Sequence, residues 1–377
     1  MGPLAGLRVL ELATLNAGPT LGAMLGDLGA DVVKVEPPEG EDFRVMNAAA
    51  EAAGRPTMWT MVGRNKRMIV VDHKEPEGVD LLRRLTSVAD VVVLNQPAKV
   101  LERMDCTYEA ISGRNRRAVV VHVSGYGATG PYADRIGNGT LGEAFAGLTH
   151  QTRLDDGTPH LSPPLLGDNL TALAGVIGTL AACYWRDARG GSGQYVDVAL
   201  YESVLAVLAP QLVAWHPDAA AAADDPAGDG APKRTGPGIR ATFRTADAKW
   251  VLVTAYSNSQ ITRLLDALGV EVDAGAGGAD LAALVEEWVA AHPLATVLDA
   301  FTASRIGIAA VNDFAGLVAD AHVQARGAVV EVDDPMVGTV RIPRPAPRLS
   351  QTPGEIRWTA RPLGADTAAV LNDWLGE

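Results

Sequence analysis

The feature that most constrains the fold is the alternation of short β-branched runs with longer helical patterns over the first 120 residues. Runs rich in Val, Ile and Leu lie at residues 7–12, 32–36, 68–72, 91–95 and 119–124. Helical patterns at 20–28 and 78–88 lie between them, and Pro76 suits the first turn of the second helix. Strands that alternate with helices pair in parallel, so the sequence predicts an α/β, Rossmann-like domain with a doubly wound parallel sheet.

The length of the chain indicates more than one domain. Its 377 residues correspond to two or three domains at about 150 residues each. An Ala-, Asp-, Pro- and Gly-rich stretch from Pro217 to Gly238 has the composition of a linker. We therefore predict a large domain over 1–215, a linker over 216–240, a smaller α+β domain over 241–327, and a C-terminal segment over 328–377 that returns to the large domain.

Later segments add further expected elements. A long helix is predicted from Asp168 to about Arg189, followed by a glycine-rich stop, a strand over QYVDVAL and a helix over 202–215. A hairpin over 241–255 precedes helices at 260–268, 281–291 and 294–303, and a last helix is expected at 366–375.

Composition excludes several classes of function. The net charge of −13 disfavours binding to nucleic acid, because the field repels phosphate backbones. Two cysteines and scattered histidines give neither a disulfide framework nor the spacing of a metal site, so we expect no metal and a reducing cytoplasm. The N-terminus lacks a basic leader, and the apolar stretch 170–185 is shorter than the ~20 residues that a bilayer requires, so no membrane association is expected.

One glycine motif satisfies the dinucleotide-binding pattern. GYGATG at residues 125–130 fits G-x-G-x-x-G and follows a predicted strand. Pro131 and the polar residues after it continue a loop instead of opening a helix that holds a pyrophosphate, so a plain glycine-rich turn is the favoured interpretation.

Basic residues gather around the predicted strand ends of this acidic chain: Arg64, Lys66, Arg67, Lys74 and Lys99. One interpretation is a grip on a polyphosphate at one edge of a parallel sheet. The alternative, which composition alone favours, is a solvated charged face.

Asp168 stands where the long helix is predicted to begin. Its simplest role is an N-cap whose oxygen accepts a backbone N–H. The functional alternative is a carboxylate nucleophile, kept ionised by the helix N-terminus and close to backbone donors that stabilise an oxyanion.

These segments together resemble the family III CoA-transferases, the group that includes formyl-CoA transferase, carnitine CoA-transferase and the α-methylacyl-CoA racemases. The resemblance covers nearly the whole chain. It is carried by the ordered blocks GLRVLELATLNAGPTLGAMLGDLGADVVKVEPPEGEDFR, NKRMIVVDHKEPEG, ADVVVLN, SGYGATGPYADR, GDN, RGGSGQYVDVAL, FRTADAKW, DAHVQARG and PLGADT.

The resemblance implies an enzyme of the EC 2.8.3 type that moves CoA from an acyl-CoA donor to a carboxylic acid. It implies an interlocked homodimer, acyl-CoA and CoA as substrates, and no permanently bound cofactor. The residue matching the family nucleophile is Asp168, which would form a mixed anhydride and then an aspartyl-CoA thioester. Shielding these intermediates from water preserves their acyl-transfer potential.

Further site residues follow from the resemblance, position by position. Asn16 and Ala17 match the turn that borders the nucleophile and are expected to supply oxyanion donors, or else to form a helix-start turn. Glu143 lies where many transferases have glutamine; it is either a site residue that affects an anionic acceptor or a solvated helix residue. The expected CoA-binding positions are Val71, Lys74, Asn95, Arg103 and Met104, with Lys66 and Arg67 from the basic group.

Departures from the family pattern leave two alternatives open. Racemase relatives carry Gly-His-Asp where this chain has Gly137, Asn138 and Gly139, so a racemase or epimerase lacks its base. Many transferases have an aromatic residue and an acid at the last two of these positions. The usual Asn-Phe-Arg-Pro-Gly element is Asn95 to Lys99 here, and the altered residues also permit a catalytically inactive CoA-binding protein.

Overall fold

A computed structural model describes residues 2–46, 57–154, 156–162, 165–215, 238–270 and 278–377. The chain divides into two compact units. Unit 1 comprises residues 1–213 and 329–377, and unit 2 comprises residues 214–328. Most of the predicted linker, 216–237, lies outside the described residues.

A six-stranded parallel sheet forms the centre of unit 1. Its strand order is β3-β2-β1-β4-β5-β6, the order of a doubly wound Rossmann-like sheet. The strands are β1 (Arg8–Glu11), β2 (Asp31–Glu36), β3 (Lys66–Val70), β4 (Val91–Leu94), β5 (Val119–Ser124) and β6 (Tyr195–Ala199). The predicted α/β fold class is confirmed.

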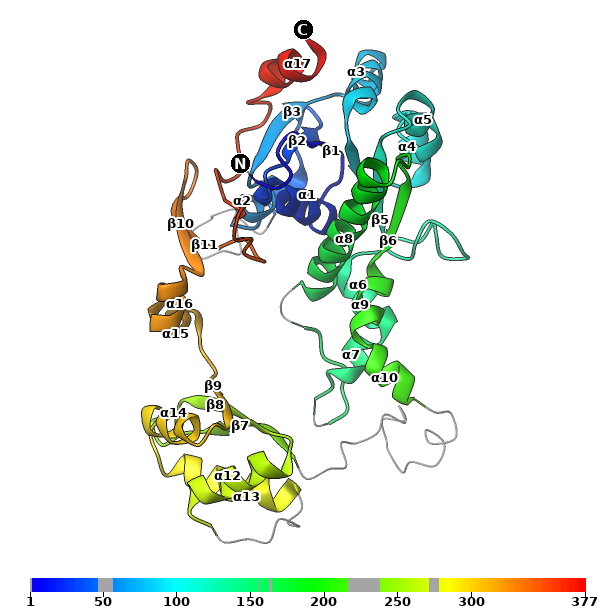
Figure 1. The fold of residues 1–377 in the computed structure, drawn as a ribbon. Coiled ribbons are helices and arrows are strands. Elements are labelled where there is room, and N and C mark those ends of the chain that lie inside the picture. Colours follow the sequence, from blue (N-terminus) through cyan, green and yellow to red (C-terminus); the bar gives the residue numbers. More distant parts are fainter. Residues whose placement is uncertain (1, 47–56, 155, 163–164, 216–237, 271–277) are drawn as a thin grey trace. The chain divides into compact units, whose positions relative to one another are not determined.

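The two faces of this sheet bury separate hydrophobic clusters, because successive side chains of a strand point to opposite sides. Val9 packs with α1 (Ala17–Asp27) and α8 (Leu166–Ala188), whereas Leu10 packs on the other face. The helices that contribute to this second cluster are α3 (Pro76–Val88), α4 (Ala98–Arg103), α5 (Tyr108–Arg114) and α17 (Thr367–Leu375). Figure 1 shows α1 and α8 side by side beneath the sheet.

The C-terminal segment of unit 1 packs against the rest of this unit at the β3 edge of the sheet. β10 (Val329–Asp334) and β11 (Gly338–Pro343) pair as an antiparallel hairpin, and α17 contacts both α3 and β3. The Asp366 carboxylate accepts the Met68 N–H at 2.8 Å, and Trp374 donates its indole N–H to Asp31 at 2.8 Å. Residues about 300 positions apart in sequence therefore share one core.

The shorter elements of unit 1 lie between the strands of its sheet or after the last of them. They are η1 (Asp42–Arg44), α2 (Thr57–Val62), α6 (Gly139–Ala146), α7 (Leu148–Gln151), α9 (Leu200–Val207) and α10 (Ala209–Ala214). The GYGATG segment is a loop, with no helix before Gly139, as expected. The single helix predicted over 202–215 is wrong, because the chain forms two helices that are separated at Leu208. Pro210 has no N–H to donate to the Ala206 carbonyl oxygen, and its ring crowds that carbonyl, so one continuous helix is disfavoured here.

Helix α8 is long and apolar enough to cross a membrane by length and composition alone. Its inner face packs on α1, β5 and β6, and Arg186 near its C-terminal end is buried. Such packing is typical of a core helix in an α/β domain.

Unit 2 is built on a three-stranded antiparallel sheet in the order β7-β8-β9. The strands are β7 (Ile239–Arg244), β8 (Trp250–Ala255) and β9 (Gly307–Ala310), and the first two form the predicted hairpin. Its core includes side chains from α12 (Asn258–Leu268), α13 (Gly278–Ala290) and α14 (Leu294–Ala303). α15 (Phe314–Ala319) and α16 (Ala321–Arg326) complete the unit.

The docking of α17 gives a stability prediction. Trp374 is 4 % exposed, so replacing it with alanine leaves a cavity and removes the indole donor to Asp31, which keeps its pairing with Arg67. We expect Trp374→Ala to lower the free energy of unfolding by about 3–5 kcal/mol. Trp250→Ala, which truncates a side chain that is 47 % exposed, is the control and should cost clearly less. Chemical denaturation of both variants measures the difference, and equal costs would show that α17 does not depend on this side chain.

Candidate active site

Asp168 lies in the first turn of α8, at the carboxyl edge of the parallel sheet. The N-cap of α8 is Leu165, so Asp168 is the third residue of the helix and the proposed capping role is wrong. An N-cap residue has non-helical backbone angles, whereas Asp168 is already inside the helix. Its carboxylate is therefore available to groups outside the helix.

The N-termini of three helices meet at this carboxylate. Asp168 belongs to the first turn of α8, Gly139 begins α6 and donates its backbone N–H to Asp168, and Asn16 is the N-cap of α1 and hydrogen-bonds the carboxylate through its side chain. The positive end of each helix dipole favours a negative charge here. The arrangement concentrates donors on one carboxylate.

Burial nevertheless raises the pKa of Asp168 above its ordinary value of 3.8. Desolvation is the main cause; the Asn16 hydrogen bond opposes it, the nearby Glu143 charge adds to it, and the Gly139 N–H opposes it. A carboxylate that is partly stripped of water is a stronger nucleophile than a solvated one, while the donors keep the ionised form accessible.

Two glycines allow these helices to approach. A Cβ on Gly139 would lie 2.3 Å from Asp168 Oδ2 and 2.7 Å from its backbone nitrogen, and a Cβ on Gly167 would lie 2.4 Å from the Gly139 carbonyl oxygen. No side chain fits at such distances. The α6 backbone itself therefore contacts the candidate nucleophile.

Glu143 is buried, with 2 % of its surface exposed. Its Oε1 accepts the Gly167 N–H at 2.8 Å, so it caps the start of α8 from α6. The interpretation of Glu143 as a solvated helix residue is therefore wrong. The carboxylate satisfies an unpaired donor of the helix N-terminus, one residue before Asp168.

The turn before α1, which carries Asn16, has a strained backbone at Leu15. Leu15 has a φ of 65°, in the left-handed region that costs a non-glycine residue about 1–2 kcal/mol. The Asn16 side-chain oxygen accepts the Thr20 hydroxyl at 3.1 Å, which leaves its amide N–H to donate to Asp168. Ala17 is the first residue of α1, where a backbone N–H has no acceptor within the helix.

Comparison with known proteins agrees with this geometry. Residues 4–367 match the sequence profile of CoA-transferase family III. The chain belongs to this family. It is 32 % identical to succinyl-CoA–D-citramalate CoA-transferase of Chloroflexus aurantiacus over 99 % of this chain and 94 % of that protein. It is 34 % identical to the succinyl-CoA–L-malate CoA-transferase β subunit of the same organism over 99 % and 94 % of the two chains.

A solved structure shares the whole fold. The crystal structure of a CAIB/BAIF family protein from Brucella suis superposes with a TM-score of 0.81 at 29 % identity and covers 99 % of each chain. The family and its named relatives establish an enzyme of the EC 2.8.3 type, and such enzymes use CoA thioesters as substrates.

The expected CoA-binding positions in this family III chain lie in three different environments. Lys74 and Arg103 are exposed, whereas Val71 and Met104 are 3 % and 4 % exposed and belong to the same core cluster. Asn95 follows β4 and clamps Thr14: it accepts the Thr14 N–H at 2.9 Å and donates to the Thr14 carbonyl oxygen at 2.8 Å. Asn95 thus fixes the start of the Asn16 turn.

The basic residues do not gather as one surface. Lys66 is fully buried and binds Glu11 at 2.7 Å, Arg67 pairs with Asp31 and Asp373, and Arg64 pairs with Asp27. Of Arg64, Lys66, Arg67 and Lys74, it is Lys74 that extends into solvent, where its ammonium lies 3.5 Å from Glu39. Lys66 is therefore not available for the expected phosphate grip. Its ammonium is buried on one face of the sheet and is paired with the Glu11 carboxylate.

Sequence reasoning missed the partners of Lys66. Glu11, Lys34 and Glu41 form buried ion pairs beneath the Asn16 turn. The signal was present: Lys34 and Glu36 interrupt an otherwise apolar strand, and Lys and Glu are almost never fully buried unless paired. Among the described residues, no group of three His, Cys, Asp or Glu is placed to hold a metal ion.

The close approach at Gly139 gives a test of the site geometry. Gly139→Ala should displace α6 from Asp168, because the new Cβ meets both the carboxylate and the backbone of that residue. We expect CoA-transferase activity to fall by about 100-fold, the scale of a misplacement of about 1 Å. Steady-state assays measure this loss.

Gly113→Ala in α5 is the matched control, since a Cβ there meets nothing within 4 Å. Because Gly113 is at an exposed helical position, the variant should have a free energy of unfolding about 0.5–1 kcal/mol higher than the wild type and should keep full activity. Full activity in Gly139→Ala would contradict the packing of α6 against the nucleophile.

Proposed function

We propose that this enzyme transfers CoA between carboxylic acids through covalent intermediates on Asp168. The observation that carries the proposal is the half-buried Asp168 carboxylate, which receives the Asn16 side chain and the Gly139 N–H where three helices begin. Carboxylates placed in this way act as nucleophiles toward acyl groups, and the adjacent N–H donors can stabilise the oxyanion that forms.

The proposed steps exchange acyl bonds without loss of energy to water. An Asp168 oxygen attacks the donor thioester carbonyl, and the C–S bond breaks to give an aspartyl anhydride and CoA thiolate. The thiolate attacks the aspartyl carbonyl, releases the donor acid and forms an aspartyl-CoA thioester. The acceptor carboxylate displaces the thiolate to form a second anhydride, and the thiolate then attacks the acceptor carbonyl, which yields the new acyl-CoA and free Asp168 carboxylate.

We further propose a succinyl-CoA donor and a dicarboxylic acid acceptor. The support is the activity named for two relatives that this chain covers almost completely, a succinyl-CoA–D-citramalate CoA-transferase and a succinyl-CoA–L-malate CoA-transferase β subunit.

A racemase function receives less support. The residue at the position of the racemase histidine, Asn138, caps α6 by accepting the Leu141 N–H at 3.0 Å. An amide side chain cannot transfer the proton that racemisation requires.

We propose a homodimer in which a second copy covers the outer face of α8. Leu173, Ile177, Tyr184 and Trp185 on this helix are 48 %, 69 %, 63 % and 52 % exposed. A contiguous apolar face of this kind is typical of a surface that binds protein. The interlocked arrangement stays a prediction of the resemblance, as does a cytoplasmic location, which the two free, buried cysteines support.

Covalent trapping tests the proposed chemistry. Incubation with succinyl-CoA followed by hydroxylamine should leave a hydroxamate on the peptide that contains Asp168, detected by mass spectrometry. Asp168→Asn should form no adduct and lose at least about 10⁴-fold in kcat, the scale of removing a nucleophile.

A stability measurement on the same variant is the control. Because burial raises the pKa of Asp168, its ionised form destabilises the fold at neutral pH. The Asn variant should therefore keep or raise the melting temperature, which separates lost chemistry from unfolding. Full turnover by this variant would refute the mechanism.

The acid limb of the pH profile gives a second test. Asp168 must be ionised to attack, so kcat/KM should fall as the pH drops through its raised pKa. Glu143→Gln removes a like charge and keeps the acceptor for Gly167, so it should move the limb to lower pH. Asn16→Ala removes a donor to the ionised form and should move the limb to higher pH. Identical limbs in both variants would assign the titration to another group.

A further inference from the structure

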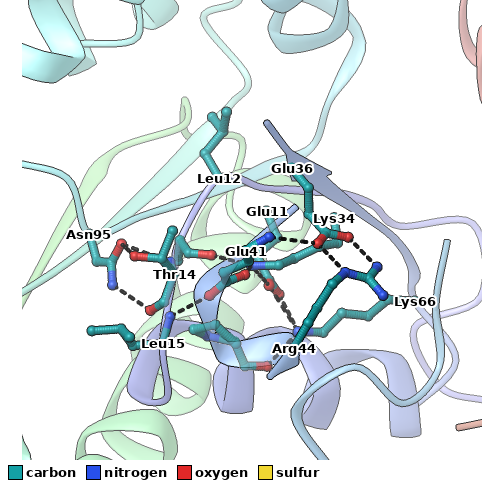
Figure 2. Close-up of polar contacts among 12 residues, drawn as sticks. Glu11, Leu12, Thr14, Leu15, Lys34, Glu36, Glu41, Arg44, Lys66 and Asn95 are labelled. Atoms are coloured by element: carbon teal, nitrogen blue, oxygen red, sulfur yellow. Dashed lines mark hydrogen bonds and ion pairs between the residues drawn. The ribbon is translucent and has the colours of Figure 1, made fainter. Parts of the chain in front are cut away.

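A cluster of four buried charges lies beneath the turn that carries Asn16. Glu11, Lys34 and Lys66 are 0 % exposed and Glu41 is 8 % exposed. Lys34 lies 2.6 Å from Glu41 and 3.3 Å from Glu11, and Lys66 lies 2.7 Å from Glu11. The cluster contains two positive and two negative groups, so its charges balance. Figure 2 shows these side chains converging from separate segments.

Sheet register brings three of these groups together. Glu11 of β1 stands opposite Lys34 of β2, and Lys66 of β3 stands opposite Val32, two residues away on the same face. Glu41 reaches the cluster from the loop after β2. That loop is fixed by Glu36, which accepts the Glu41 N–H at 3.3 Å and binds Arg44 at 2.6 Å.

Three members of the cluster also bind the backbone of the turn and of the first turn of α1. Lys34 donates to the Ala13 carbonyl oxygen, Glu41 accepts the Leu15 N–H at 2.6 Å, and Lys66 donates to the Pro19 carbonyl oxygen at 2.7 Å. Asn95 holds Thr14 from the opposite side. Every residue from Ala13 to Leu15 is therefore anchored through its backbone by a polar side chain.

The turn needs such an anchor. Leu15 is in the left-handed region at a φ of 65°, and its side chain is 46 % exposed, so hydrophobic packing does little to hold it there. Strained backbone of this kind persists only where surrounding contacts determine it. The next residue is Asn16, whose amide hydrogen-bonds Asp168.

Buried ion pairs are an expensive way to gain stability, because desolvation offsets most of the attraction, and well-packed apolar residues often do as well. Their directional bonds to Ala13, Leu15 and Pro19 provide what apolar residues do not, namely fixed backbone positions.

We propose that Glu41 and Lys34 are positioning residues that hold the strained Leu15 turn so that Asn16 meets Asp168. The inference rests on the proposed role of Asp168. It assigns a function to the buried charge cluster: the charges act on the reaction through backbone geometry and do not contact substrate.

The test compares three variants with one matched control. Glu41→Ala removes the acceptor of the Leu15 N–H, whereas Glu41→Gln retains one. The double variant Lys34→Met with Glu41→Leu removes the hydrogen bonds to Ala13 and Leu15 without leaving an unpaired buried charge. It should therefore fold, so that a loss of activity is not explained by unfolding. Asp27→Asn is the control, because it disrupts another buried pair, Asp27 with Arg64 at 2.7 Å, away from the turn.

Two measurements are made on each full-length variant: hydrogen exchange of the peptide spanning 12–21, and kcat and KM for transfer from succinyl-CoA. We expect faster exchange in Glu41→Ala and in the double variant, with kcat about 100-fold lower and KM for the CoA thioester unchanged. Glu41→Gln should restore most of kcat. Asp27→Asn should lower the melting temperature while kcat stays at the wild-type value.

Full kcat in the folded double variant would overturn the proposal, as would unchanged exchange of 12–21. Failure of the proposed function is distinguishable, because it would show as a wild-type protein that forms no Asp168 adduct. In that case the exchange measurement still decides whether Glu41 and Lys34 hold the turn.

Discussion

The structure depends on keeping one carboxylate partly dry and yet ionisable. Burial raises the pKa of Asp168, and hydrogen-bond donors at fixed positions oppose this shift by stabilising the ionised carboxylate. Those donors come from α1, which follows β1, and from α6, which follows β5. The two helices start close together because the parallel strands before them end at the same edge of the sheet. The Rossmann-like order therefore serves to bring helix N-termini together.

Close backbone approach is the second constraint. Gly139 and Gly167 let α6 and α8 touch where any side chain would separate them, and Gly22 does the same for α1, since a Cβ there would lie 1.8 Å from Glu11 Oε2. Glycines therefore allow close approach both at Asp168 and where α1 packs on the buried charges. Site geometry and core packing are parts of one arrangement in this region.

Local patterns predicted the sheet and most of the helices of unit 1 well. β-branched runs and glycine stops depend on neighbours in sequence, so the strands and α8 were expected close to where they lie. Contacts between distant segments were not accessible in this way. Lys66 was interpreted as a surface cation because nothing near it in sequence shows that Glu11, fifty-five residues earlier, lies beside it. Glu143 similarly acquires its role only when α6 packs against Gly167. The resemblance, which compares whole blocks, supplied Asp168 and Asn16 where composition did not.

The desolvation of the buried charges and the backbone strain at Leu15 both lower the stability of the fold. A chain selected only for stability would replace Lys34 and Glu41 with apolar residues and relax the turn to negative φ. Both changes would release the backbone that places Asn16. Unfavourable local choices at the carboxyl edge of an otherwise regular sheet are expected where geometry matters more than stability, since natural sequences depart from local rules chiefly at functional sites. The departures here, a left-handed Leu15, a dehydrated Asp168 and two lysines inside a sheet face, lie within one connected set of hydrogen bonds.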